Sequence, residues 1–239
     1  NTEKCCFTIT VNDKEAPVII DCPENITVYT NNRSTCDQLV NWIPPTASDN
    51  CSLLSLTSNY ESGTIFPVGS TTVTYTASDN NFPANSSTCS FEITVIDNTP
   101  PVFNTCALPQ SAIVTDGCSV EVPNFINDDV VFSDNCGTVN ITQSPIAGEW
   151  LSYTETPHDI TITATDEAGN KTECVTTFTV LKAAINGTLV YNNSAQTPLN
   201  NVTLTLMPGN QTSITDDDGN YRFTDLCAQT YIIEVTDNK

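Results

Sequence analysis

Cysteines recur along this chain in sets of four, with a period of about 84 residues. The first set and its repeat are Cys22, Cys36, Cys51 and Cys89, then Cys106, Cys118, Cys136 and Cys174. The third cysteine of each set follows the same three residues, Ser-Asp-Asn. A repeat of this length is typical of an array of small β domains.

The repeat also divides the chain into segments. Residues 5–11 read like residues 89–95, so residues 1–15 are predicted to hold the last strand of a preceding domain. Two full repeats follow at residues 16–98 and 99–182, and each begins at a junction of Asp and Pro that favours an extended backbone. After Lys182 no further four-cysteine set begins, so residues 183–239 are interpreted as a third domain of another kind.

The composition favours strands over helices. Thr, Asn, Val, Ser and Asp are abundant, whereas long stretches of helix-forming residues are absent. Alternating apolar residues are expected to face a core, among them Phe91, Ile93 and Val95, then Val175, Phe178 and Val180. We therefore expect an all-β fold of tandem β-sandwiches lying end to end, followed by a smaller C-terminal β-sandwich.

The cysteines and the charge limit the environment of the chain. Eleven cysteines at repeating spacings indicate disulfides, and therefore a secreted, extracellular or cell-surface location. Zinc is disfavoured because no Cys-x-x-Cys occurs and His158 is the only histidine. A formal charge of −21, from 28 acidic and 7 basic residues, argues against nucleic acid or an anionic membrane as a partner.

The sequence contains no segment typical of membrane insertion or export. No apolar run reaches the roughly 18 residues that a bilayer-spanning helix needs. The first residues lack a charged region followed by an apolar one, so we expect a mature protein or an internal fragment. The expected partners are neighbouring domains of the same long chain, and a protein or glycan ligand.

The repeats resemble hyalin-repeat (HYR) domains. In the first repeat the matching residues are Pro17–Pro23, Asn25–Val28, Trp42, Pro45–Cys51, Ser62–Gly69 and Thr72–Asp79. The second repeat keeps Ala164–Asn170 but has no counterpart of Phe66–Gly69. The resemblance implies immunoglobulin-like β-sandwiches in an extracellular stalk with a proposed role in adhesion, and it implies no catalysis.

The last segment resembles carboxypeptidase-regulatory-like and Cna-B-like modules of surface proteins. The match covers Thr215–Phe223, Leu226 and Tyr231. Some of those modules carry a Lys–Asn isopeptide bond, but the opening strand here offers only Lys182, so that bond is not carried over.

Four cysteines in a repeat allow three disulfide pairings, and the sequence alone does not choose among them. The immunoglobulin-like layout places two connections at one end, which favours Cys51–Cys89 and Cys136–Cys174. Cys22–Cys36 and Cys106–Cys118 then follow. Cys6 and Cys227 are left over, either free, bridging to other chains, or paired across domains.

Two groups of acidic residues are candidate calcium ligands. Asp216, Asp218 and Asn220 alternate around a glycine, as oxygen ligands of Ca²⁺ do in tight loops, although a plain hairpin turn explains the same residues. Asp13 and Asp97 lie at the domain junctions, and further aspartates lie near the domain ends: Asp49, Asp79, Asp134 and Asp166. The alternative is that these aspartates cap turns.

Asn-x-Ser/Thr sequons make several asparagines candidates for glycosylation, namely Asn25, Asn140, Asn170, Asn186 and Asn201. Catalysis is not expected, because His158 and Asp159 have no assigned nucleophile. Trp42 and Trp150 are expected in the core, although exposed aromatic residues could bind sugars.

The sequence therefore predicts a non-catalytic stalk or filament segment of an extracellular multidomain surface protein that serves adhesion or display. Two alternatives stay open. One is a carbohydrate-binding accessory region of a secreted enzyme, and the other is part of a eukaryotic extracellular glycoprotein appendage.

Overall fold

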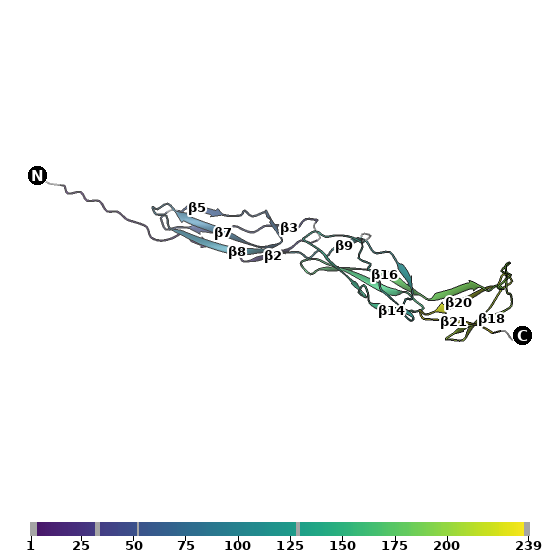
Figure 1. The fold of residues 1–239 in the computed structure, drawn as a ribbon. Helices are drawn as coiled ribbons and strands as arrows, with labels where there is room; N and C mark the ends of the chain where they lie inside the picture. The colour runs from purple at the N-terminus through teal and green to yellow at the C-terminus, as the bar shows by residue number, and fades with distance from the viewer. Residues whose placement is uncertain (1–3, 32–33, 52, 128–129, 237–239) are drawn as a thin grey trace. The chain divides into compact units, whose positions relative to one another are not determined.

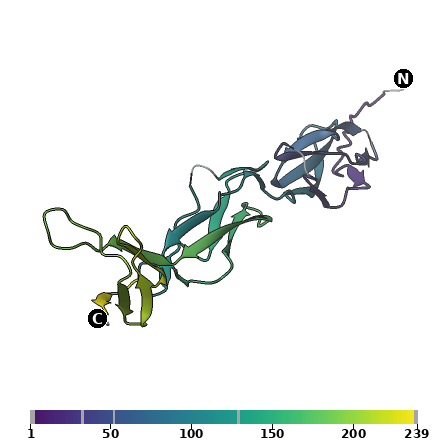
Figure 2. The same ribbon diagram turned by 90° about the vertical axis from the view of Figure 1, so that its right-hand side faces the viewer.

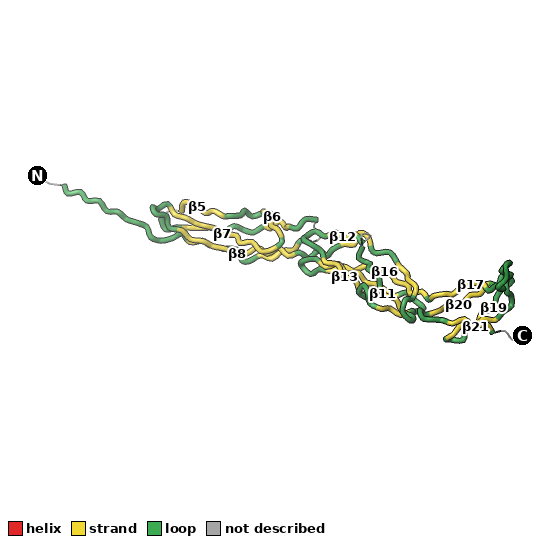
Figure 3. Tube along the Cα trace, in the orientation of Figure 1, coloured by secondary structure: helices red, strands yellow, loops and turns green. Residues whose placement is uncertain are grey.

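A computed structural model describes residues 4–31, 34–51, 53–127 and 130–236. The described residues form strands and loops without a helix, so the prediction of an all-β fold is confirmed (Figure 3). The chain divides into two compact units. Unit 1 comprises Asn1–Pro101, Asp134–Thr138 and Asp166–Asn170, and unit 2 comprises Val102–Ser133, Val139–Thr165 and Lys171–Lys239.

Unit 1 contains eight strands in three sheets. They are β1 (Val18–Ile20), β2 (Ile26–Tyr29), β3 (Asp37–Val40), β4 (Thr46–Ser48), β5 (Leu53–Ser58), β6 (Thr64–Pro67), β7 (Gly69–Asp79) and β8 (Ser86–Ile96). The largest sheet has the order β2-β8-β7-β5, in which the long β7 and β8 lie side by side (Figures 1 and 2). The smaller sheets pair β3 with β6 and β1 with β4. β2 runs parallel to β8, with Ile26 opposite Ile93.

The core of unit 1 is built around Trp42, which is 9% exposed. Its indole Nε1 donates a 2.8 Å hydrogen bond to the Tyr75 hydroxyl, and its ring meets Phe91 edge-on at 5.5 Å. A buried indole N–H needs such a partner. Trp42 is thus a core residue, as expected from the sequence.

The strands of unit 2 begin by repeating this topology. The strands are β9 (Val102–Thr105), β10 (Gln110–Ile113), β11 (Ser119–Glu121), β12 (Val131–Ser133), β13 (Asn140–Ser144), β14 (Trp150–Ser152), β15 (His158–Thr165) and β16 (Lys171–Leu181). The order β10-β16-β15-β13 matches β2-β8-β7-β5, and β10 is again parallel to β16. The pairs β11-β14 and β12-β9 match the two smaller sheets of unit 1.

The remaining strands of unit 2 form two further sheets. They are β17 (Ala183–Thr188), β18 (Thr203–Met207), β19 (Gln211–Ile214), β20 (Asn220–Leu226) and β21 (Ile232–Val235), in the orders β17-β20 and β19-β18-β21. Leu204, Leu206, Phe223 and Leu226 form their buried core. The larger core of unit 2 includes Phe125, Ile160 and Phe178.

Cys6–Val11 pairs with none of the described residues, and Phe7, Ile9 and Val11 are exposed, so its assignment as the last strand of a preceding domain stays a prediction. A sequence-based expectation about a single residue is wrong. Trp150 is 48% exposed and lies outside the buried core, since it occupies the outward face of the two-stranded sheet β11-β14.

The disulfides are Cys22–Cys89, Cys36–Cys136, Cys106–Cys174 and Cys118–Cys227. The expected pairs, Cys51–Cys89, Cys136–Cys174, Cys22–Cys36 and Cys106–Cys118, are therefore wrong. The parallel strand pairs explain the difference: Cys22 precedes Ile26 by as many residues as Cys89 precedes Ile93, so the two cysteines lie opposite each other on the extended register. Cys5, Cys6 and Cys51 are free and exposed.

Candidate metal centre

Unit 1 contains two sets of three aspartates. The first set is Asp13, Asp49 and Asp79, and the second is Asp97, Asp134 and Asp166. In each set the three carboxylates offer oxygen atoms within 4.8 Å of one another. The sets occupy corresponding positions of the repeat, so the structure brings together the junction aspartates and the domain-end aspartates that the sequence singled out.

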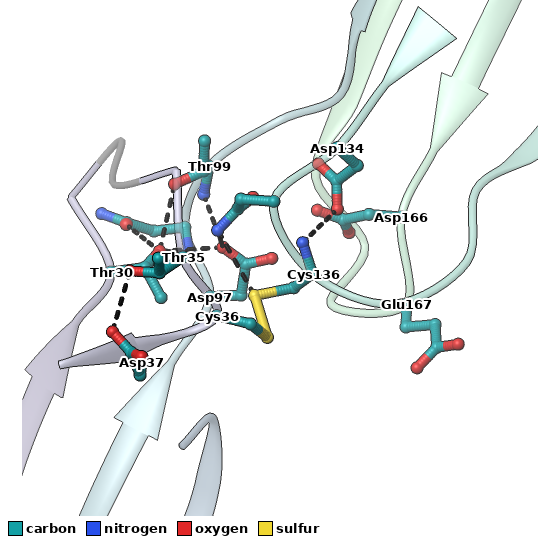
Figure 4. Close-up of a disulfide and its surroundings, with 12 residues drawn as sticks. Thr30, Thr35, Cys36, Asp37, Asp97, Thr99, Asp134, Cys136, Asp166 and Glu167 are labelled. Carbon is teal, nitrogen blue, oxygen red and sulfur yellow. Dashed lines mark hydrogen bonds between the residues drawn. A yellow bond between two sulfur atoms is a disulfide. The ribbon is translucent and has the colours of Figure 1, made fainter. Parts of the chain in front are cut away.

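The second set gathers the ends of three strands. Asp97 follows β8, Asp134 follows β12, and Asp166 follows β15. Asp97 and Asp166 are buried, at 4% and 6% exposure, and Asp134 is half-buried. Figure 4 shows the three carboxylates beside the Cys36–Cys136 disulfide, with Glu167 directed away from them.

Hydrogen bonds fix one face of each carboxylate in the second set. Asp97 Oδ1 accepts from Thr30 Oγ1 at 2.8 Å, from Thr99 N at 3.1 Å and from Asn135 Nδ2 at 3.2 Å. Asp134 Oδ2 accepts from Cys136 N at 3.0 Å. Asp166 accepts from the backbone N–H and from the side-chain amide of Asn170, each at 2.8 Å. These hydrogen bonds hold the three carboxylates in place, and they occupy one oxygen of Asp97, one of Asp134 and both of Asp166.

Three oxygen atoms of this cluster have no donor among the described residues. They are Asp97 Oδ2, Asp134 Oδ1 and Asn135 Oδ1, and all three are shielded from solvent. A buried oxygen without a hydrogen-bond donor is costly and calls for a bound ion or water. Three such oxygens together, two of them on carboxylates, form a group of ligands that a bound cation would satisfy.

The first set is built in the same way but is more open. Asp49 Oδ1 accepts from Cys51 N at 3.0 Å, as Asp134 does from Cys136, and Asn81 Nδ2 donates to Asp13 Oδ2 at 3.1 Å. Asp13 and Asp49 are half-buried, whereas Asp79 is fully buried. The two sets therefore present the same ligand types with different degrees of burial.

Hydrogen bonds favour the ionised form of two carboxylates of the first set, Asp13 and Asp79. The backbone N–H of Glu15 lowers the pKa of Asp13 below its usual value. Burial alone raises the pKa of Asp79, but hydrogen bonds from Asn81 and Asn85 outweigh it, so the net shift is downward. Both groups stay charged well into the acidic range, as cation ligands must.

These residues fit a hard divalent cation. Carboxylate and amide oxygens are the ligands of Ca²⁺ and Mg²⁺, and Ca²⁺ accepts the irregular geometry that loop residues provide. Neither histidine nor a thiolate belongs to either set, so softer metals such as zinc are disfavoured.

The loop around Asp216 differs from both sets. Asp216 Oδ1 accepts from the N–H groups of Asp218 and Asn220, at 3.0 and 2.7 Å, and the Asn220 bond lowers the pKa of Asp216. Asp166–Asn170 forms the same turn, with Gly169 and Gly219 at the positive φ that it requires. No other described residue brings a carboxylate close enough to Asp216 to complete a group of three, so its hydrogen bonds are those of a turn.

The candidate glycosylation sites differ in their exposure to solvent. Asn25, Asn140, Asn186 and Asn201 are exposed, but Asn170 is half-buried. Its Nδ2 atom donates both of its hydrogens, to the Asp97 carbonyl at 3.2 Å and to Asp166 Oδ2 at 2.8 Å. Sequence reasoning thus assigned Asn170 to glycosylation and missed its part in the aspartate site, as it missed Thr30 and Asn135. The repeated Ser-Asp-Asn-Cys was the available signal for Asn135.

We expect Asn170 to be unmodified when the chain is secreted from a glycosylating eukaryotic host. A sugar replaces one amide hydrogen of Nδ2, and the fold uses both. Peptide mass spectrometry checks this, with exposed Asn25 and Asn140 as controls for sequon use. High glycan occupancy at Asn170 in folded, secreted protein would contradict the role of its side-chain amide in the aspartate site.

Part of the chain matches a known protein family. Residues 12–95 match the family model described as HYR domain. That span contains the first aspartate set and most of unit 1. The match confirms the HYR resemblance for this repeat.

Relatives of this chain include hyalin of Strongylocentrotus purpuratus, 30% identical over 92% of this chain and 20% of the relative. Hyalin of Lytechinus variegatus is 31% identical over 74% of this chain and 33% of its own length. The sushi, von Willebrand factor type A, EGF and pentraxin domain-containing protein 1 of Rattus norvegicus is 34% identical over 70% of this chain and 4% of its length. The chain thus spans a third or less of these relatives.

Among solved structures, mouse cadherin-23 EC22–24 aligns with 90% of this chain and 90% of its own, at 14% identity and a TM-score of 0.38. The described residues contain no helix that is long and apolar enough to cross a membrane.

Proposed function

We propose that this chain is a non-catalytic structural segment of an extracellular, multidomain adhesion protein, and that calcium fastens its repeats. The HYR match and the hyalin relatives support the extracellular adhesive role. Because the relatives come from sea urchins and rodents, an animal glycoprotein is favoured among the alternatives that the sequence left open. Residues 99–182 are proposed as a second HYR-like domain, supported by their identical strand order.

The observation that carries the calcium proposal is the group of buried oxygens without donors in the second set. Asp97 Oδ2, Asp134 Oδ1 and Asn135 Oδ1 come from two loops that are distant in sequence. A cation bound to them links the end of β8 to the loop after β12, and Asp166 adds the loop after β15. The ion would act as a clamp on loop positions and would perform no chemistry.

Isothermal titration calorimetry of the chelator-stripped chain tests this proposal. We expect two Ca²⁺ ions per chain, one for each aspartate set, with dissociation constants of about 10⁻⁴–10⁻³ M or tighter, as in extracellular modules. Asp49→Asn and Asp134→Asn should each reduce the number of bound Ca²⁺ ions from two to one per chain.

Asp216→Ala is the matched control, because it removes a carboxylate that lies in a turn and not in a three-carboxylate group. It should leave two ions. The proposal of a calcium clamp is wrong if the parent chain shows no heat of binding when calcium is added and its melting temperature is unchanged in EDTA.

A further inference from the structure

The disulfides connect residues that are far apart in sequence, with separations of 67 for Cys22–Cys89, 100 for Cys36–Cys136 and 109 for Cys118–Cys227. In the structural role proposed above, on which this inference rests, tension enters the chain before Cys22 and leaves it after Cys227. A disulfide passes tension across the fold without drawing out the residues that it encloses. The order of the cysteines therefore determines which strands can be pulled apart.

One covalent route crosses unit 1 through Cys22–Cys89. It continues along the backbone from Cys89 to Cys118 and then across the Cys118–Cys227 bond. Residues between Cys22 and Cys89, which include β2 to β7, lie outside this route. The parallel register of β2 and β8 places this bond at the point where a pull on the two ends would shear the strands.

A second route reaches the same point by other bonds. It follows the backbone from Cys22 to Cys36, crosses Cys36–Cys136, and returns along the backbone from Cys136 to Cys118. Either route from Cys22 to Cys118 contains about 30 residues of backbone, roughly 100 Å when fully extended. The two routes are therefore matched in length.

We propose that Cys22–Cys89 and Cys36–Cys136 are redundant load-bearing bonds, so that tension cannot draw out the segment from Cys36 to Cys89 until both are broken. Hydrogen bonds of the β2–β8 ladder yield individually under load, whereas each route ends on a covalent bond. Cys36–Cys136 joins a cysteine of the first four-cysteine repeat to one of the second. It therefore provides the second of the two covalent routes.

Force-extension measurements on the full oxidised chain, held at both ends through handles that do not use cysteine, test the proposal. The contour length at high force should agree, to within about 10 Å, among the parent, Cys22→Ala/Cys89→Ala and Cys36→Ala/Cys136→Ala. The variant that combines all four substitutions should be longer by about 230 Å, because the separation of 67 residues is released.

A second measurement uses the parent chain, so that it does not depend on the folding of a variant. Under constant force, dithiothreitol should release the extension of about 230 Å only after a lag, since two bonds must be cleaved. In Cys36→Ala/Cys136→Ala the same extension should appear without a lag. Release of this length by either pair alone, or no lag in the parent, overturns the proposal, and neither result depends on calcium binding.

Discussion

Replacing Asp97 by asparagine is expected to abolish the stabilisation that calcium gives through the second aspartate set. In calcium at about 100 times the dissociation constant, the parent gains about 2.7 kcal/mol from each occupied site, and the variant loses that gain at the second site. The corresponding fall in melting temperature is on the order of 10 °C. In EDTA, however, the variant should melt at or above the parent.

The reason lies in the two oxygens of Asp97. The asparagine Oδ1 can keep the bonds from Thr30 and Thr99, while its Nδ2 replaces the oxygen that has no donor. That amide can donate to Asp134 Oδ1, which also has none, and one negative charge leaves the cluster.

Differential scanning calorimetry in calcium and in EDTA measures both effects. Asp159→Asn, on an exposed position of β15, is the control with the same change in net charge. If Asp97→Asn lowers the melting temperature equally in the two buffers, the carboxylate has only a structural role.

Phe178→Ala should destabilise unit 2 by about 3–5 kcal/mol. Phe178 is fully buried in β16 and meets Phe125 edge-on, with the ring centroids 6.2 Å apart. Truncation removes that contact and leaves a cavity beneath β15 and β16, which the paired strands cannot close.

Urea denaturation followed by circular dichroism checks this value. Val175→Ala on the same strand is the control, because Val175 is 59% exposed and its truncation should cost less than about 1 kcal/mol. Equal losses in the two variants would mean that the inward face of β16 is assigned wrongly.

The contrast between these two residues shows what local pattern predicts. Both were expected to face a core, but they are three residues apart and therefore lie on opposite faces of β16, whereas Phe178, Phe91 and Trp42 are in cores as expected. The same expectation placed Val175 and Trp150 inside as well, although each is exposed. The alternation of β16 itself places Val175 on the outward face, with Phe178 and Val180 on the inward one, so strict period-2 counting separates the two residues.

Non-local pairing limited the prediction of the covalent framework and of the site. Cys22–Cys89 depends on the parallel register of β2 with β8, and Cys106–Cys174 on that of β10 with β16, and no local residue pattern encodes either register. The aspartates at the junctions could be found because Asp13 and Asp97 repeat beside proline. Thr30 and Asn170 could not, because their role follows from contacts with Asp97 across more than sixty residues of sequence.

If calcium binds as proposed, the corresponding positions of the two aspartate sets would make ion content a measure of chain length. Each repeat contributes one junction aspartate and two loop aspartates, so duplication of a repeat would add one complete aspartate set along with its strands. In a chain assembled from many such repeats, bound calcium per unit mass would stay constant. The ionic composition of the surroundings would then act on every junction at once.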